Sequence, residues 1–212
     1  EALLADIEEI ETIHIFVCSF SAHADLLSQW RGYCPPGAGY SIGFSSDEIG
    51  ALADRLFGFC FGKCTYDPLK QRKAVEELVD FHIRKKRAQR AGESAVKPSE
   101  HFIWSMFFRE ALAFMAPLLK HKAFEEEAEW RLVSRPLPHS SSMFCHRPGR
   151  SHIIPFAKLP LSDEGQPIRI RRVIVGPTPH PDLARDAVHS LLGASGDTGC
   201  AIERSKVPFR SW

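Results

Sequence analysis

Short runs of β-branched and aromatic residues alternate with longer amphipathic stretches along the chain. Seven runs have the composition of strands: 13–20, 40–44, 59–66, 129–135, 151–156, 168–175 and 200–205. Five stretches repeat apolar residues at helical spacing: 24–33, 46–57, 70–90, 99–120 and 181–192. Pro117 is expected to kink or end the fourth helix.

These elements do not alternate strictly. The pattern therefore predicts an α+β fold with a mixed, largely antiparallel sheet and flanking helices. A length of 212 residues fits one domain over 1–212. The helices between 70 and 120 are expected to form a helical insertion within it. The chain opens on Glu1 and an apolar helical face, so we expect a further segment upstream.

Composition is that of an ordinary globular protein, with 44% hydrophobic and 25% charged residues and a net charge of +1. This balance gives no overall attraction to nucleic acid, and the basic run 84–90 is expected to be a solvated helix face. No apolar run approaches the length of about 20 residues that spans a bilayer, and no signal peptide is visible. A cytoplasmic protein without a membrane partner is expected.

Six cysteines are too sparse for a disulfide scaffold in a chain of this length. Cys60 and Cys64 form a single pair of neighbouring thiols, whereas structural zinc sites usually combine two such pairs. We therefore expect free, buried thiols and no metal.

The first segment with candidate chemistry is 18–44. Ser19 and Ser21 are two residues apart, so both hydroxyls should lie on one face of the first strand. Trp30, Tyr33 and Tyr40 could form an aromatic wall for a planar ligand. Arg31 is a further candidate ligand-binding residue beside them.

The same segment has a structural interpretation. Trp30 would fill the core, and Arg31 would place its charge at the carboxyl end of a helix. These residues alone do not decide between a ligand site and core packing.

The second segment is 124–133, in which four glutamates occur within five residues. Glu127 and Glu129 would share a face if a strand begins there, and Arg131 would continue it and could pair with Glu129. Crowded carboxylates suit an acid, a base or an anchor for a ribose hydroxyl. The alternative is a solvated acidic turn with one structural ion pair.

Several motifs together resemble a bacterial family called domain of unknown function 2971. They are Cys-Ser-Phe-Ser at 18–21, Asp-Leu-Leu-Ser-Gln-Trp-Arg-Gly-Tyr at 25–33, Gly-Tyr-Ser-Ile-Gly-Phe at 39–44, Glu-x-Glu-Trp-Arg at 127–131, Ile-Val-Gly-Pro at 174–177 and Ser-Lys-Val-Pro-Phe-Arg at 205–210. Members of that family usually begin with a strand-rich block that carries an Asn-Asp-Pro signature. This chain lacks that block, in line with the expected upstream segment.

The Ser-x-Ser and Glu-x-Glu elements are also similar to those of ADP-ribosyltransferases. That resemblance implies NAD as substrate, with Glu129 holding the nicotinamide ribose and stabilising an oxocarbenium-like centre. Glu127 would orient the acceptor, and Ser19 and Ser21 would brace the site. The spacing between the two elements is long, and requires the helical insertion.

In the same resemblance, Trp30 or Tyr40 would stack on nicotinamide.

Two functional hypotheses follow. The first is a bacterial cytosolic effector that binds NAD and transfers or hydrolyses its ADP-ribose. The second is a non-catalytic interaction or sensor module, for example in phage defence or a toxin system, in which Trp30, Tyr33 and the group 127–131 are structural or contact a partner protein. The first requires Ser19, Trp30, Glu127 and Glu129 to converge in one cleft.

Overall fold

The computed structural model describes residues 14–56, 58–90, 108–163, 166–196 and 199–209. It divides into two compact units, unit 1 with residues 1–20 and 53–159, and unit 2 with residues 21–52 and 160–212. The helix expected at the start of the chain lies outside the described residues. A single domain over 1–212 stays a prediction.

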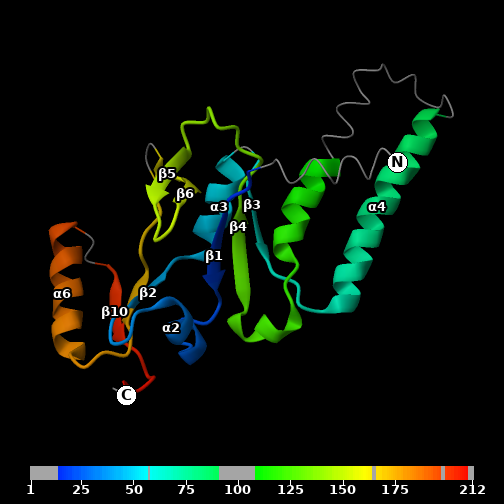
Figure 1. Ribbon diagram of the computed structural model, residues 1–212. Helices are drawn as coiled ribbons and strands as arrows, with labels where there is room; N and C mark the ends of the chain where they lie inside the picture. Colours follow the sequence, from blue (N-terminus) through cyan, green and yellow to red (C-terminus); the bar gives the residue numbers. More distant parts are fainter. Residues whose placement is uncertain (1–13, 57, 91–107, 164–165, 197–198, 210–212) are drawn as a thin grey trace. The chain divides into compact units, whose positions relative to one another are not determined.

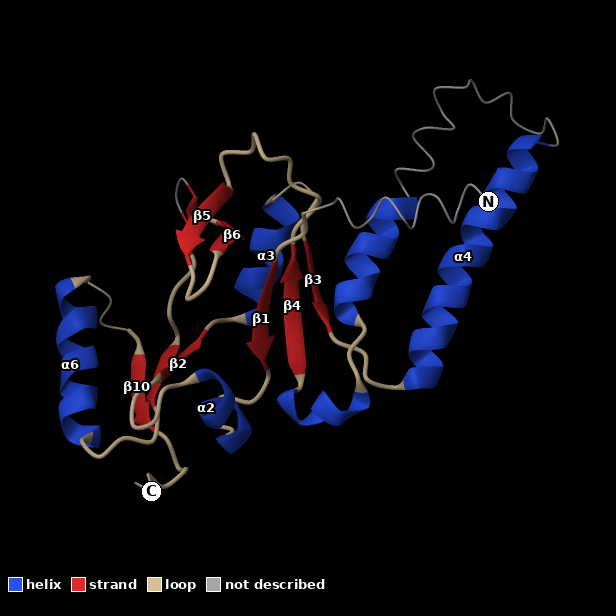
Figure 2. Cartoon of the chain, in the orientation of Figure 1, coloured by secondary structure: helices blue, strands red, loops and turns tan. Residues whose placement is uncertain are grey.

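Unit 1 contains a three-stranded sheet in the order β1-β4-β3 (Figure 2). The strands are β1 (Val17–Ser21), β4 (Glu129–Val133) and β3 (Cys60–Lys63). β3 and β4 pair antiparallel, with Cys60 opposite Val133. Val133 is fully buried, so the end of β4 lies in the core. The position of β1 beside β4 brings the serines of the first motif to the strand that begins with Glu129.

A helical region separates β3 and β4 along the chain, although these strands pair directly. It includes α4 (Pro68–Arg90), helical residues 108–115 and the 3₁₀ helix η2 (Ala116–Leu118) (Figure 1). The Asp67 carboxylate accepts the backbone N–H of Leu69 at 2.9 Å and caps the start of α4. The α-helix at 108–115 gives way to 3₁₀ structure before Pro117, as the sequence predicts. That this region is an insertion relative to other chains stays a prediction.

A β-hairpin completes the strands of unit 1. β5 (Phe144–Pro148) pairs antiparallel with β6 (Ile153–Ala157). The sequence pattern predicts β6 but not β5, because three of the five residues of β5 are polar or proline and do not alternate.

Unit 2 contains a second sheet in the order β10-β9-β2. β2 (Tyr40–Gly43) is antiparallel to β9 (Arg172–Val175), whereas β10 (Ala201–Arg204) is parallel to it. The parallel connection runs through α6 (Pro181–Ala194), which lies along β10 (Figure 1). The short α2 (Leu27–Tyr33) also belongs to this unit, together with the small ladder of β7 (Ser162–Asp163) and β8 (Gln166–Pro167). α3 (Ser46–Arg55) runs across the boundary between the units in the chain.

The predicted α+β class is confirmed, with both parallel and antiparallel strand pairs. The strands form several small sheets rather than the single sheet expected from the sequence. No helix within the described ranges combines the length and the apolar content needed to cross a membrane.

Candidate functional site

Glu129, the first residue of β4, lies at the centre of a charged cluster in unit 1. The Lys120 ammonium donates to Glu129 Oε2 at 2.5 Å. Arg131 donates through Nε to Oε1 at 2.9 Å and through Nη2 to Oε2 at 3.0 Å. The bonds from Lys120 and Arg131 therefore occupy three of the roughly four lone-pair sites of the carboxylate. The Ser19 hydroxyl lies close enough to this carboxylate to help lower its pKa.

The backbone fixes where each member of the cluster lies. Arg131 shares a strand face with Glu129 because side chains two residues apart point the same way. The backbone N–H of Lys120 donates to Thr65 O at 3.1 Å, and its carbonyl accepts the side-chain amide of Gln71 at 2.7 Å. Lys120 is therefore held between the end of β3 and the start of α4.

Glu127 also contacts Lys120, although it does not lie on β4 beside Glu129. It is the last residue of the 3₁₀ helix η3 (Lys122–Glu127), and Ala128 is left-handed with φ of 42°. The sequence predicts that Glu127 and Glu129 share a strand face. This prediction is wrong, because the chain turns at Ala128. The Glu127 carboxylate nevertheless accepts a hydrogen bond from the Lys120 ammonium. The predicted pairing of Arg131 with Glu129 is confirmed.

The pKa shifts keep the cluster in one charge state at neutral pH. Burial alone would raise the pKa of Glu129, which is 5% exposed, but the side chains of Arg131, Lys120 and Ser19 lower it to about 2. Burial opposes the charge of Lys120, yet its bonds to Glu127 and Glu129 raise its pKa. Glu129 is therefore ionised and Lys120 protonated across the physiological range.

Two further side chains lie beside the cluster. The Tyr66 hydroxyl accepts the backbone N–H of Glu129 at 2.8 Å, and burial raises the pKa of this phenol. Burial also raises the pKa of the Cys64 thiol, although the charge of Arg131 acts in the opposite direction. Both groups are neutral at pH 7. A general acid or base works best with a pKa near the working pH, and none of these shifts moves a group toward it.

The depressed pKa of Glu129 predicts a loss of stability in acid. Its ordinary value is 4.5 and its folded value about 2, so between these pH values the unfolded chain binds more protons. The stabilisation is complete above the unfolded pKa and is lost as the pH falls toward 2, by about 3 kcal/mol in all. Urea unfolding from pH 6 to pH 2.5 should show this decline, and Glu129→Gln should make it shallower. An equal slope in both proteins would contradict the assignment.

Unit 2 contains a pocket of about 550 Å³. Its walls come from α2, the turn at 34–38, Pro177 and the segment 207–209. The lining is mostly apolar and includes Trp30 and Phe209, with Arg31 as its charged residue. Gly37 in this turn has φ of 74°, a conformation that favours glycine, and its α-carbon faces the Phe209 ring.

A hydrogen-bond network holds the pocket wall to the end of the described chain. The buried Trp30 indole donates to Asp25 Oδ1 at 2.7 Å, and Asp25 also accepts from the Ser205 hydroxyl at 2.5 Å and the Lys206 N–H at 2.7 Å. Burial alone would raise the pKa of Asp25, but these three bonds lower it. The network connects the start of α2 to the segment that contributes Phe209.

The predicted site residues divide between the two units. Ser19, Glu127, Glu129 and Arg131 meet in unit 1, whereas Trp30 and Arg31 line the pocket of unit 2. Their roles in catalysis or ligand binding stay predictions.

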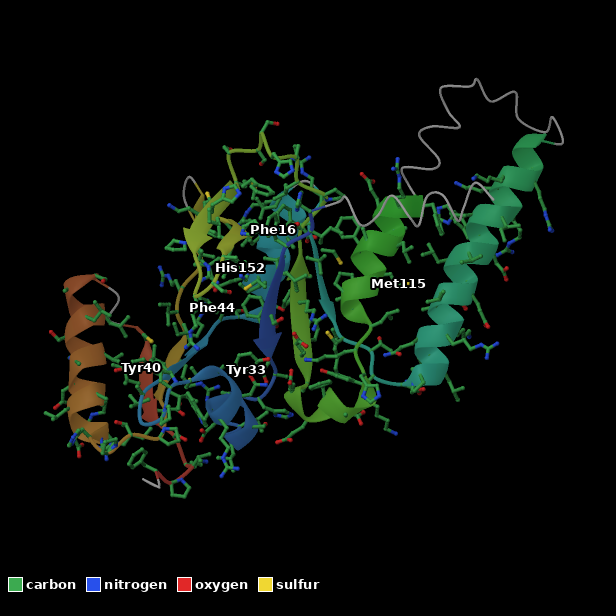
Figure 3. All side chains as sticks on the ribbon, in the orientation of Figure 1. Phe16, Tyr33, Tyr40, Phe44, Met115 and His152 are labelled. Atoms are coloured by element: carbon green, nitrogen blue, oxygen red, sulfur yellow. The ribbon has the colours of Figure 1, made fainter. Side chains whose placement is uncertain are left out.

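The remaining predicted residues lie outside both groups. Tyr33 on α2 is 74% exposed and Tyr40 on β2 is 49% exposed (Figure 3). Neither residue lines the pocket. The Ser21 hydroxyl bonds locally to the backbone of His23. Sequence reasoning missed Lys120, since nothing in Lys-His-Lys at 120–122 marks one lysine as buried.

Among the described residues, no group of three or more histidine, cysteine, aspartate or glutamate side chains could hold a metal ion. All six cysteines are free, but only Cys64 is buried and Cys18 is exposed, so the expectation of buried thiols is wrong for most of them.

Residues 29–132 match a protein-family model described as "Protein of unknown function (DUF2971)". The match supports the family resemblance over that segment, which includes the Glu-x-Glu-Trp-Arg motif. Comparison with curated proteins and with solved structures finds no match. The analogy with ADP-ribosyltransferases receives no support from these comparisons.

Proposed function

We propose that the chain is a non-catalytic recognition module of the bacterial cytosol, and that its pocket in unit 2 binds a small molecule with an apolar body and one anionic group. The observation that carries this proposal is an arginine in an otherwise mostly apolar pocket. Its volume of about 550 Å³ is within the range of roughly 300–1,000 Å³ usual for small-molecule sites.

Arg31 supplies the specificity in this proposal. No carboxylate among the described residues forms a salt bridge with it, although salt bridges to Arg171, Arg172, Arg185 and Arg204 occur in the same unit. A guanidinium next to aromatic and proline surfaces recognises a carboxylate, sulfonate or phosphate on an apolar ligand. The charge of Arg31 is therefore available to a ligand, while Trp30 and Phe209 provide apolar contact.

The charged cluster of unit 1 is better explained by a structural role than by catalysis. Glu129 is buried, and both of its carboxylate oxygens already bind Lys120 or Arg131. A carboxylate that stabilises a cationic reaction centre must reach the substrate and keep negative charge for it. Two cations already neutralise Glu129, so the cluster is better suited to holding β4, the end of η3 and Lys120 together.

A fluorescent probe tests the pocket directly. Anilinonaphthalene sulfonate combines an apolar aromatic body with one anionic group, and we expect saturable binding at one site per folded chain. Arg31→Gln should weaken it about tenfold, because a hydrogen bond to a charged group contributes about 1.5 kcal/mol or more. Ala38→Trp, which adds bulk to the pocket wall, should abolish binding.

The control is Arg169→Gln, which removes the same charge from an exposed position of unit 2 outside the pocket lining. Near-ultraviolet circular dichroism must show native packing in every variant, because this dye also binds partly folded states. Unchanged binding by Arg31→Gln and Ala38→Trp would contradict the proposed pocket.

A second candidate function is ADP-ribosyl transfer from NAD, favoured by the Ser19 hydroxyl beside Glu129, where it lowers the pKa of the carboxyl group. In this reaction the bond from the ribose to nicotinamide breaks, nicotinamide leaves with the bonding electrons, and water or an acceptor hydroxyl attacks the ribose and releases a proton. The candidate requires wild-type protein to release nicotinamide and Ser19→Ala to reduce the rate. Failure of wild type to release nicotinamide would rule it out.

A further inference from the structure

A pair of histidines in unit 1 faces each other outside the sites described above. His14 precedes β1 and His139 lies in the turn before β5, and their Nε2 atoms are 3.1 Å apart. Without a bound cation, a contact between these atoms requires one nitrogen to carry a proton and the other to accept it. The two Nε2 atoms are therefore close enough to share one proton or to bind the same cation.

The surrounding chain holds both rings in place. Leu137 donates its backbone N–H to His14 O at 3.0 Å, and Ser134 donates to Phe16 O at 2.9 Å. The Phe144 ring contacts both imidazoles, with centroids 5.4 Å from His14 and 5.0 Å from His139. Phe16, labelled in Figure 3, packs on the same Phe144 ring at 5.3 Å. Backbone hydrogen bonds and aromatic packing therefore hold the two Nε2 atoms facing each other.

The separation of the nitrogens fits a metal ion. Imidazole nitrogens bind zinc at about 2.0–2.1 Å. Two nitrogens 3.1 Å apart would subtend an angle of roughly 100° at such an ion, by triangle geometry with those bond lengths. This angle lies between those of square-planar and tetrahedral coordination, the geometries that Cu²⁺ and Zn²⁺ adopt.

We propose that His14 and His139 form a binding site for a divalent first-row transition metal, with both Nε2 atoms as ligands and water in the remaining positions. The protein would supply two ligands, since the described side chains contain no group of three or more that could hold a metal ion. Imidazole suits Cu²⁺, Ni²⁺ and Zn²⁺, and Cu²⁺ should bind most tightly of the three. The site is independent of the pocket in unit 2.

Electron paramagnetic resonance of the full chain, treated with chelator and then given one equivalent of Cu²⁺, tests the site. The wild-type spectrum should show superhyperfine structure from two imidazole nitrogens. His14→Gln and His139→Gln should each leave one nitrogen and lower the Cu²⁺ affinity at least tenfold. His152→Gln, at an exposed position of the same unit, should behave as wild type.

Zn²⁺ gives a second measurement. Excess Zn²⁺ should raise the unfolding midpoint of wild type and of His152→Gln, because a metal that binds the folded state stabilises it. The increase should disappear in His14→Gln and His139→Gln, whose folding is checked in chelator by circular dichroism. Cu²⁺ spectra and affinities that are the same in all four proteins would overturn the proposal.

Discussion

Replacing Glu129 with glutamine is expected to lower the free energy of unfolding by about 3 kcal/mol, because removing one partner of a buried ion pair leaves the charge of Arg131 uncompensated and that of Lys120 balanced by Glu127 alone. Lys120 and Arg131 would each lose a carboxylate partner, with side chains that are 14% and 20% exposed. An amide also presents donors where these cations need acceptors. Urea unfolding at pH 7 measures the change.

The matched control is Glu125→Gln, which removes the same charge from an exposed position on η3. Its effect should stay within about 0.5 kcal/mol, as is usual for surface substitutions. A loss at Glu129 no larger than that at Glu125 would show that the cluster does not hold the fold.

The second large effect is expected for Trp30→Ala, at about 3 kcal/mol or more, since removing a buried tryptophan leaves a cavity. Trp30 is 8% exposed, and its ring lies against Gly176, where an added Cβ would be 2.9 Å from Cζ3. The substitution also removes the indole donor from Asp25. Thermal and urea unfolding measure the loss, and dye binding by the pocket should fall with it.

Tyr33→Ala is the control for Trp30, because both aromatic residues lie on α2 but Tyr33 is 74% exposed. It should change stability by less than about 0.5 kcal/mol. Trp30→Phe keeps an aromatic ring while losing the bond to Asp25, and should fall between the two. Equal effects at Trp30 and Tyr33 would contradict the packing described for unit 2.

Local patterns predicted most of the secondary structure, since strands and helices follow from apolar spacing within a few residues. They also predicted that Arg131 pairs with Glu129, because residues two apart on a strand share a face. Side-chain spacing did not reveal the left-handed Ala128, which separates Glu127 from the strand. Alanine is not a residue that normally marks such a conformation.

Contacts between segments that lie far apart in the sequence could not be predicted from the local pattern of apolar and polar residues. Lys120 reaches Glu129 because Thr65 and Gln71 hold its backbone, and no periodicity in one sequence records that arrangement. The pocket likewise depends on Asp25 binding Ser205 and Lys206, which are about 180 residues further along the chain. The division of the strands into several small sheets has the same origin, because strand order is decided by such long-range pairing.

Parallel measurement of NAD turnover and stability in wild type and Glu129→Gln tests most directly whether Glu129 is structural. We expect wild type to release no nicotinamide above an enzyme-free sample, and the variant to lose about 3 kcal/mol of unfolding free energy in urea. Nicotinamide release by wild type that Glu129→Gln abolishes, with an unchanged free energy of unfolding, would contradict this account and assign Glu129 to catalysis.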